Sequence, residues 1–289
     1  MNDADGAKVR TLRLDLEFDG EAFFGWQRQA SERTVQATVE HALSTILQET
    51  VRVVAAGRTD AGAHASHMVA SARIASALPA DRIARGLDAI LPEDVGVRAV
   101  RDALPDFHAQ RDAAWTWYRY SLLRVRGRRP LLRRRTWARW GPLEDAALEA
   151  VADVVRGRHD FASFANHGSP RRSTVRTLKA VRWTWEEELL HLDVVGDGFL
   201  YKMVRTLVGT MVHLVHACAL DGQGAVEAAT RMRAVMDARR RSAAGPAAPA
   251  HGLCLMAVGF EEDDARRRLP PHLLRDVESV PSRTLGERP

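Results

Sequence analysis

The sequence predicts an α/β protein made of two tandem units, each of the split βαβ or ferredoxin-like kind. Two observations predict this class. Apolar residues alternate, or recur at helical spacing, in the order β-α-β-β-α-β over roughly the first hundred residues. The same order returns in the second half, with one additional helix. Such units are expected to build a shared, mainly antiparallel sheet with helices on one face, which leaves the other face free for a cleft.

The first unit is expected to begin with a strand, because Leu12, Leu14 and Leu16 alternate with polar neighbours. Thr34 is the expected N-cap of the next helix, which carries apolar residues at helical spacing. Pro79 is expected to open a second helix. The remaining elements expected in this unit are strands at residues 51–55, 67–74 and 95–100.

The second unit is expected to repeat the pattern with longer helices. Its expected elements are a strand at 115–123, a helix at 142–156 ended by Gly157, a hairpin of strands at 181–185 and 189–195, helices at about 199–219 and 225–240, and a strand at 253–260. The domains are therefore expected at residues 8–104 and 105–262. Residues 242–249, rich in Ala, Pro and Gly, are expected to form a linker or mobile loop. Residues 263–289 are expected to be a charged, flexible tail.

Composition narrows the class of protein. No apolar run is expected to approach the roughly 18 to 20 residues that cross a bilayer. The polar N-terminus lacks the apolar core of a secretory signal, so the expected compartment is the cytoplasm. Cys218 and Cys254 lie far apart and form no metal-type pair, so buried structural thiols are expected.

Positive charge is concentrated in one segment. The net charge is +5 and the pI is about 9.7, which is compatible with a polyanionic partner. Residues 124–139 read RVRGRRPLLRRRTWAR. This stretch indicates either a solvated loop or a surface that contacts nucleic acid.

The segment Gly57–Ala65, with the sequence GRTDAGAHA, joins two predicted strands and carries Asp60 between glycines. One interpretation is a turn in which Asp60 caps local amides. The loop is too long for a simple hairpin turn, which favours a functional site. Asp60, His64 and His67 also allow a zinc site, but no second cluster of ligands supports it.

A second cluster, residues 196–205, leads into the long apolar helix. A helix N-terminus attracts phosphate through its free amides and dipole. Lys202 and Arg205 lie three residues apart and so share a helix face. Arg205 is costly to bury without a carboxylate, and Asp60 is a candidate partner whose pKa the pairing would lower.

A third cluster contains Phe107 and His108, followed by Trp117, Tyr118 and Tyr120. Alternation places the two tyrosines on one face of their strand and the tryptophan on the other. The aromatic rings are expected either to stack on an extruded base or to pack in the core. The sequence lacks the glycine motifs that bind nucleotides or dinucleotides, which disfavours enzymes of those classes.

Together these clusters resemble the TruA family of tRNA pseudouridine synthases. The resemblance extends to about Phe260 and rests on motifs in the family's order: FDG at 18–20, FGWQ at 24–27, GRTDAGAHA at 57–65, FHA at 107–109, HDF at 159–161, TVRTL at 174–178, GFLYKMVR at 198–205 and HGL at 251–253. Gln110 and Arg111 depart from the family's usual Arg and Phe, which puts one RNA contact in doubt.

The resemblance implies a pseudouridine synthase fold and the isomerisation of uridine at positions 38, 39 and 40 of the tRNA anticodon stem-loop. It implies a homodimer that uses no cofactor and no metal. The implied catalytic residues are Asp60, Tyr118 and Arg205. The expected substrate contacts are Arg58, Thr59, His64, Phe107, His108, Lys202 and Leu253.

Two rival classes remain open at this point. One is a non-catalytic RNA-binding module built on two RRM-like units, which would carry an RNP1-like run that the sequence lacks. The other is a metal-dependent hydrolase that uses Asp60, His64 and His67.

Overall fold

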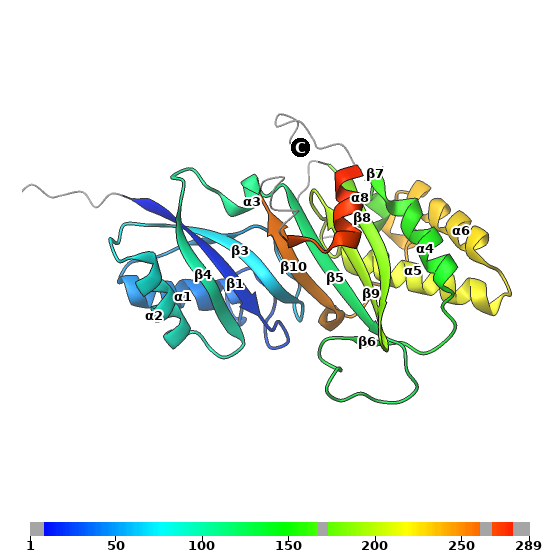
Figure 1. The fold of residues 1–289 in the computed structure, drawn as a ribbon, viewed down its shortest axis with the longest axis horizontal. Helices are drawn as coiled ribbons and strands as arrows, with labels where there is room; N and C mark the ends of the chain where they lie inside the picture. The colour runs from blue at the N-terminus through cyan, green and yellow to red at the C-terminus, as the bar shows by residue number, and fades with distance from the viewer. Residues whose placement is uncertain (1–8, 167–172, 261–267, 280–289) are drawn as a thin grey trace, which may run out of the picture. The chain divides into compact units, whose positions relative to one another are not determined.

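The computed structural model describes residues 9–166, 173–260 and 268–279, which form two compact units (Figure 1). The first unit contains the residues up to Ala113 together with Leu255–Phe260, and the second contains Ala114–Cys254 and the C-terminal residues. The division differs from the expected one after residue 104. Residues 105–113 belong with the first unit because the Ala109 amide donates to Ser71 Oγ at 3.1 Å. The rings of Phe107 and Phe260 also lie 5.2 Å apart.

The first unit has the predicted β-α-β-β-α-β order. Its elements are β1 (Arg10–Phe18), α1 (Val35–Leu47), β2 (Val53–Ala55), β3 (His64–Ile74), α2 (Ala80–Ile90), β4 (Val95–Ala103), the short α3 (Ala109–Asp112) and most of β10 (Leu253–Gly259). The strands follow the order β4-β1-β3-β10, and β2 pairs with β3. The pairs β1–β3, β1–β4 and β2–β3 are antiparallel. β3 begins three residues earlier than expected, at His64.

Local sequence explains these elements. Leu12, Leu14 and Leu16 have no exposed surface, so alternate residues of β1 enter the core as predicted. The Thr34 side chain accepts a hydrogen bond from the Ala37 amide at 3.4 Å, which confirms the predicted N-cap of α1.

The second unit contains the strands and helices that the sequence predicts, together with shorter elements that it does not. Its elements are β5 (Trp115–Leu123), β6 (Trp137–Ala138), α4 (Asp145–Val155), β7 (Gly157–Asp160), β8 (Val175–Glu186), β9 (Leu189–Gly196), α5 (Met203–Leu220) and α6 (Ala225–Asp237). The order is β5-β9-β8-β7, with antiparallel pairing, and β6 pairs in parallel with β5. α5 begins at Met203 rather than near 199 because Lys202 has a left-handed backbone, with φ 58°.

Helix α5 corrects one expectation from composition. Its 18 residues are long and apolar enough to cross a membrane by length and composition alone. However, 61% of the helix is buried inside the structure. The apolar residues of α5 are therefore accounted for by its place in the core of the second unit.

Residues 244–249, here called the strap, are ordered, and the expectation of a linker or mobile loop is wrong. The Gly245 amide donates to Thr210 Oγ1 at 3.0 Å, and the Ala248 amide donates to the Arg205 carbonyl at 2.9 Å. A Cβ on Gly209 would lie 1.9 Å from the Pro246 carbonyl oxygen, so this close approach to α5 requires glycine. The strap is fixed by hydrogen bonds to α5. Hydrogen bonds of this kind leave no apolar periodicity in the sequence, so the sequence did not predict the ordered strap.

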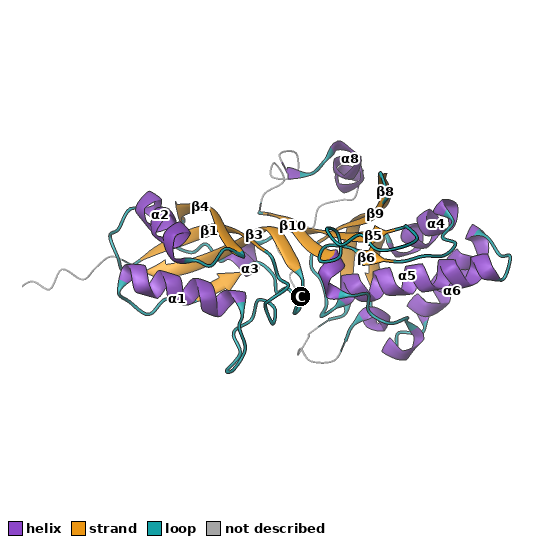
Figure 2. Cartoon of the chain, turned by 90° about the horizontal axis from the view of Figure 1, so that it is seen from below, coloured by secondary structure: helices purple, strands orange, loops and turns teal. Residues whose placement is uncertain are grey.

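The expected flexible tail contains a helix, α8 (Pro271–Ser279). Leu269, Leu273 and Val277 recur at four-residue spacing and are buried. The Arg182 guanidinium of β8 donates to both carboxylate oxygens of Asp276, at 2.6 and 2.9 Å. In Figure 2, α8 lies on the side of β8 and β9 opposite to α5 and α6. Residues 263–267 and 280–289 of the predicted tail lie outside the described residues.

Candidate active site

The loop that carries Asp60 joins β2 to β3 and is held by the segment at residues 18–27, here called the opening segment. The Trp26 amide donates to the Thr59 carbonyl, and the Gly62 amide donates to the Phe23 carbonyl, each at 3.1 Å. The Ala63 amide donates to the Asp60 carbonyl at 3.1 Å and closes a turn. Backbone hydrogen bonds on both sides therefore fix the position of Asp60.

Two glycines allow the opening segment to approach this loop. A Cβ on Gly20 would lie 1.9 Å from the Ala63 carbonyl oxygen, and one on Gly25 would lie 2.6 Å from the Thr59 carbonyl oxygen. Gly25 also has φ +81°, which side-chain-bearing residues rarely adopt. The backbone of the opening segment thus supports the loop without intervening side chains.

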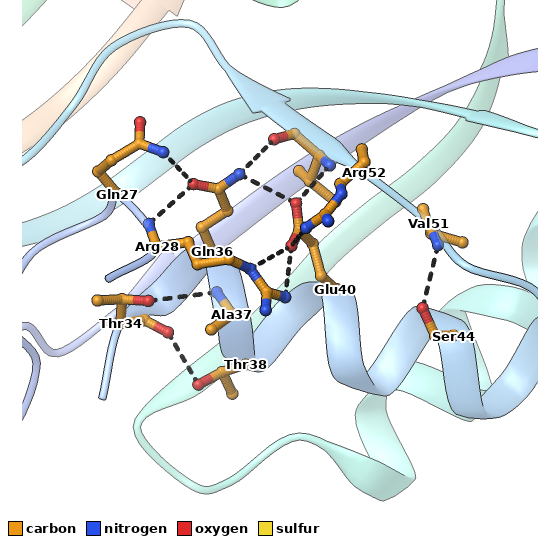
Figure 3. A network of polar contacts seen from close by, with 11 residues as sticks. Gln27, Arg28, Thr34, Gln36, Ala37, Thr38, Glu40, Ser44, Val51 and Arg52 are labelled. Carbon is orange, nitrogen blue, oxygen red and sulfur yellow. Dashed lines mark hydrogen bonds and ion pairs between the residues drawn. The ribbon is translucent and has the colours of Figure 1, made fainter. Parts of the chain in front are cut away.

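A polar network ties the opening segment to α1 and β2 (Figure 3). Glu40 is 1% exposed and accepts hydrogen bonds from the Val53 amide at 2.9 Å, from Gln36 Nε2 at 3.0 Å and from Arg28 Nε at 2.9 Å. Gln36 Oε1 accepts from Gln27 Nε2 at 2.8 Å. Burial alone would raise the pKa of Glu40, but these hydrogen bonds and the Arg28 charge outweigh it and lower that pKa.

The side chains of the loop face different surroundings. Asp60 is half-buried, Arg58 is exposed and Thr59 is 7% exposed. His64 is 4% exposed, and its Nδ1 lies 3.1 Å from the Gly20 amide nitrogen and 3.0 Å from Asp19 Oδ1. His64 therefore holds the opening segment through Nδ1, and a substrate contact from this residue stays a prediction.

The structure gives no support to a metal site at this loop. Among the residues that it describes, no group of three or more His, Cys, Asp and Glu side chains is placed to hold a metal ion. His67 Nε2 instead lies 3.3 Å from Asp15 Oδ1 on β1. The three candidate zinc ligands, Asp60, His64 and His67, are therefore not gathered around one point.

Tyr118 lies on β5 in the second unit, on the strand face predicted from alternation. It is 7% exposed, and its ring meets the Phe199 ring edge to face at 5.0 Å. The neighbouring Trp117 points to the opposite face, where its Nε1 donates to Asp193 at 2.8 Å. Arg119 joins the same carboxylate through two hydrogen bonds of 2.8 and 2.9 Å.

Arg205 and Tyr120 are both anchored to the strap. Arg205 Nε donates to the Ala248 carbonyl at 2.7 Å, and the Tyr120 hydroxyl donates to the next carbonyl, that of Pro249, at 2.9 Å. Burial raises the pKa of Tyr120 far above its usual range, and the nearby Arg205 charge only partly opposes this. The strap thus orients a guanidinium from α5 and a neutral phenol from β5.

The remaining predicted contact residues have local partners. The Lys202 ammonium lies 5.0 Å from the centre of the Tyr201 ring. Leu253, the first residue of β10, is 6% exposed. The ring of Phe107 packs on Phe260, and His108 Nδ1 accepts from the Arg111 amide at 3.0 Å and so caps α3. Arg111 folds back onto the carbonyl of Asp106, at 2.6 Å.

Sequence reasoning missed the residues that support the site. Gly20 and Gly25 lie within motifs that were recognised, but no spacing rule reveals which loop they approach. Glu40 is indistinguishable in sequence from a solvated helix residue, yet it is almost fully buried. Its only early signal is a carboxylate on the same helix face as the core residues Val39 and Leu43.

Comparison with known proteins identifies the family. Residues 16–111 and 151–261 match the family described as tRNA pseudouridine synthase. The tRNA pseudouridine synthase A of Pelobacter propionicus is 38% identical over 252 residues, which cover 87% of this chain and 100% of the relative. The protein of the same name in Geobacter sulfurreducens is 40% identical, with the same coverage. That of Chloroflexus aurantiacus is 40% identical over 274 residues, which cover 93% of this chain and 92% of the relative.

A solved structure described as a Cbf5-Nop10-Gar1 complex gives a weaker likeness, with a TM-score of 0.34 and 12% identity, and covers 91% of this chain and 68% of that chain. The sequence matches alone place the chain in the class of RNA-modifying isomerases. It belongs to the tRNA pseudouridine synthase family, and the relatives it matches over most of its length are of the TruA type. The α/β fold class predicted from the sequence is confirmed, and α8 lies beyond the end of the family match at residue 261.

Proposed function

We propose that this protein converts uridine to pseudouridine at positions 38, 39 and 40 of the tRNA anticodon stem-loop, with Asp60 as the catalytic carboxylate. The observation that carries this proposal is the support of the Asp60 loop. Hydrogen bonds from the Trp26 and Gly62 amides hold it on both sides, so the backbone that carries the carboxylate occupies a fixed place. A carboxylate that merely capped a turn would not need a second segment to hold the turn.

The proposed reaction breaks the bond between N1 of the uracil and C1′ of the ribose. The uracil then rotates and is joined to C1′ through C5, while the C5 proton is lost and N1 gains a proton. The atoms balance without any oxidant, reductant or cofactor. The ionised Asp60 acts either as the nucleophile at C1′ or as the base at C2′. The target base is first extruded from the stem-loop, at a cost of a few kcal/mol.

We assign the other residues by their chemistry. Arg205 is the proposed guanidinium partner of Asp60, and the hydrogen bond from its Nε to the Ala248 carbonyl supports this because it orients the planar group. Tyr118 is proposed to stack on the uracil and to relay a proton. Leu253 is proposed to line the apolar pocket that retains the detached base.

The polar contacts proposed for the RNA lie on both units. Arg58, which is exposed, and Lys202 would bind phosphates. Thr59, His64, Phe107 and His108 are proposed to contact the nucleotides around the target. We also propose that the protein works as a homodimer in the cytoplasm, with each tRNA touching both subunits.

The test is tritium release from C5-labelled uridine in undermodified tRNA. The wild type should release tritium, and Asp60→Asn should fold normally and release none. Asp88→Asn is the matched control, since Asp88 is exposed on α2 and should retain full activity. Near-wild-type turnover by Asp60→Asn would refute the catalytic assignment.

The same assay separates the rival classes. A non-catalytic RNA-binding module would bind the tRNA and release no tritium. A metal-dependent hydrolase would lose its activity in EDTA, whereas the proposed isomerase keeps it.

A further inference from the structure

The arginine loop, defined as residues 124–139 between β5 and α4, holds the whole net positive charge of the protein. It contains eight arginines and no aspartate or glutamate. The full chain has 42 basic and 37 acidic residues, so without these eight arginines it would have 34 basic and 37 acidic residues. The remainder of the chain is slightly acidic. A general bias toward arginine would not concentrate the positive charge in one segment in this way.

The arginine loop has a defined conformation. The Leu132 amide donates to the Arg129 carbonyl and the Arg135 amide to the Leu132 carbonyl, each at 3.0 Å. Thr136 is 4% exposed, and its Oγ1 donates to the Leu132 carbonyl at 2.8 Å. At its end, the Arg139 amide donates to the Leu123 carbonyl of β5 at 3.0 Å. These hydrogen bonds therefore fix the backbone of residues 129–139.

Two arginines of this loop serve the fold, and six face solvent. Arg124 donates to the Leu143 carbonyl at 3.1 Å, and Arg139 lies 6.0 Å from the centre of the Trp137 ring. Both are half-buried. The exposed arginines are Arg126, Arg128, Arg129, Arg133, Arg134 and Arg135.

Two of the exposed arginines have partners close to the loop. Arg129 forms a two-pronged ion pair with Glu188, with distances of 3.0 and 2.7 Å. Arg133 donates to the Pro130 carbonyl of its own turn, at 3.3 Å. Like charges gathered in one short segment repel one another, and a polyanion relieves this repulsion. Arginine is also the side chain best shaped to bind phosphate through two parallel hydrogen bonds.

An aromatic surface adjoins these charges. Trp140 is 57% exposed, and the Arg126 guanidinium lies 4.6 Å from the centre of its ring. Exposed aromatic rings interleaved with arginines are typical of surfaces that bind RNA through phosphates and stacking. A partner that is only acidic would not need the exposed indole.

The position of the arginine loop separates it from the reacting nucleotide. It follows Leu123, five residues after Tyr118 on the same strand. At a rise of about 3.3 Å per residue, the loop begins at Arg124, six residues and about 20 Å from the tyrosine that is proposed to stack on the uracil. We infer that the arginine loop binds the sugar-phosphate backbone of the tRNA outside the anticodon stem-loop, an inference that rests on the proposed function. The loop contributes affinity for the whole tRNA and takes no part in the chemical step.

The test replaces three exposed arginines by glutamine, as Arg126→Gln, Arg128→Gln and Arg133→Gln in one variant. The matched control carries Arg82→Gln, Arg233→Gln and Arg275→Gln, which remove the same charge from exposed positions outside the loop. Binding of full-length tRNA is measured over a range of salt concentrations, together with kcat and KM. The same kinetic constants are measured with the isolated anticodon stem-loop.

The loop variant should bind full-length tRNA about tenfold or more weakly, and the slope of log affinity against log salt should fall by about two to three units. Its kcat at saturating tRNA and its KM for the isolated stem-loop should match those of the control. An unchanged salt slope in the loop variant would overturn the inference. Binding of both variants to anionic lipid vesicles is also measured, and a loop variant that loses vesicle binding but keeps its tRNA affinity would overturn the inference as well. Failure of the proposed function can be distinguished from failure of this inference. If the wild type formed no pseudouridine, the binding measurement would still show whether the arginine loop sets the salt dependence of tRNA affinity.

Discussion

Gly25 lies so close to Thr59 that a Cβ on the glycine would stand 2.6 Å from the threonine carbonyl oxygen. Thr59 directly precedes Asp60, so the backbone of the opening segment presses against the backbone of the proposed catalytic residue. We therefore expect Gly25, which has no side chain, to help position the carboxylate of Asp60.

We predict that Gly25→Ala lowers kcat about tenfold or more, because the new methyl group must displace the Asp60 loop and small displacements of reacting groups are costly. The unfavourable φ adds a stability cost of about 1–2 kcal/mol. Single-turnover kinetics and thermal unfolding measure the two effects separately.

Gly222→Ala is the matched control for this change. Gly222 also has positive φ, +70°, but none of the described atoms lies within 4 Å of the point that a Cβ would occupy there. This variant should lose similar stability and keep its kcat. If Gly25→Ala also keeps its kcat, the close approach at Thr59 does not position Asp60.

We predict that Glu40→Gln lowers the free energy of unfolding by about 1–3 kcal/mol at pH 7, because a buried hydrogen-bonded carboxylate is lost. The pKa of Glu40 is lower in the folded state than in the unfolded state. Its stabilisation is therefore complete above the unfolded value of about 4.3 and disappears as the pH falls through the lower folded value.

Urea unfolding of the wild type and of Glu40→Gln at pH 7 and at successively lower pH measures this effect. The difference between the two proteins should narrow below about pH 4.3. Glu93→Gln, at an exposed position, should match the wild type throughout. A difference that does not change with pH would show that the charge of Glu40 is not the stabilising feature.

We predict that Gly209→Ala destabilises the protein by about 1–3 kcal/mol, since its methyl group collides with the Pro246 carbonyl. Alanine in place of a helical glycine ordinarily stabilises a protein by about 1 kcal/mol. The sign of the change in unfolding free energy therefore shows whether the collision with the Pro246 carbonyl occurs. Gly86→Ala in α2 is the control, because its methyl group would meet only the flexible Ile46 side chain at 3.0 Å. Pseudouridine formation should fall in Gly209→Ala alone, since the strap orients Arg205.

We predict that Arg205→Lys lowers kcat about a hundredfold with a smaller change in KM. A lysine ammonium is a point charge and cannot bind the Ala248 carbonyl while presenting a planar pair of donors elsewhere. Steady-state kinetics on undermodified tRNA measure both constants. Full activity in this variant would remove Arg205 from the proposed mechanism.

We predict that Asp276→Asn lowers stability by about 0.5–1 kcal/mol at pH 7 and leaves kcat unchanged, because α8 lies outside the family match. Arg182 lowers the pKa of Asp276, so this stabilisation is present above about pH 3.9 and is lost as the pH falls further. Thermal unfolding at pH 7 and pH 3 measures the effect. A fall in kcat would instead give α8 a part in the reaction.

Most of the fold could be predicted because its strands and long helices have clear apolar periods. Leu12, Leu14 and Leu16 alternate and are buried, as expected. Among the elements that were missed, β6, β7 and α3 have two to four residues and are too short to show a period. Helix α8 was missed because its nine residues lie in a charged, proline-bearing segment. The strap was misjudged because hydrogen bonds to Arg205 and Thr210 fix it.

The predictable part of the site was its motif residues, which the family resemblance named. The tyrosines of β5 could also be placed on one strand face, and the structure has them there. The supporting contacts could not be predicted, because they join residues far apart in sequence. For example, His64 Nδ1 accepts a hydrogen bond from the Gly20 amide, and no spacing in the sequence predicts this contact.

Transplanting residues 57–65 into another scaffold would not reproduce this site. The loop has no hydrophobic core of its own, and its shape depends on amide hydrogens and on glycines from residues 20–26. An engineer who wished to move the carboxylate would have to graft both segments as one cassette and keep Gly20 and Gly25 unchanged.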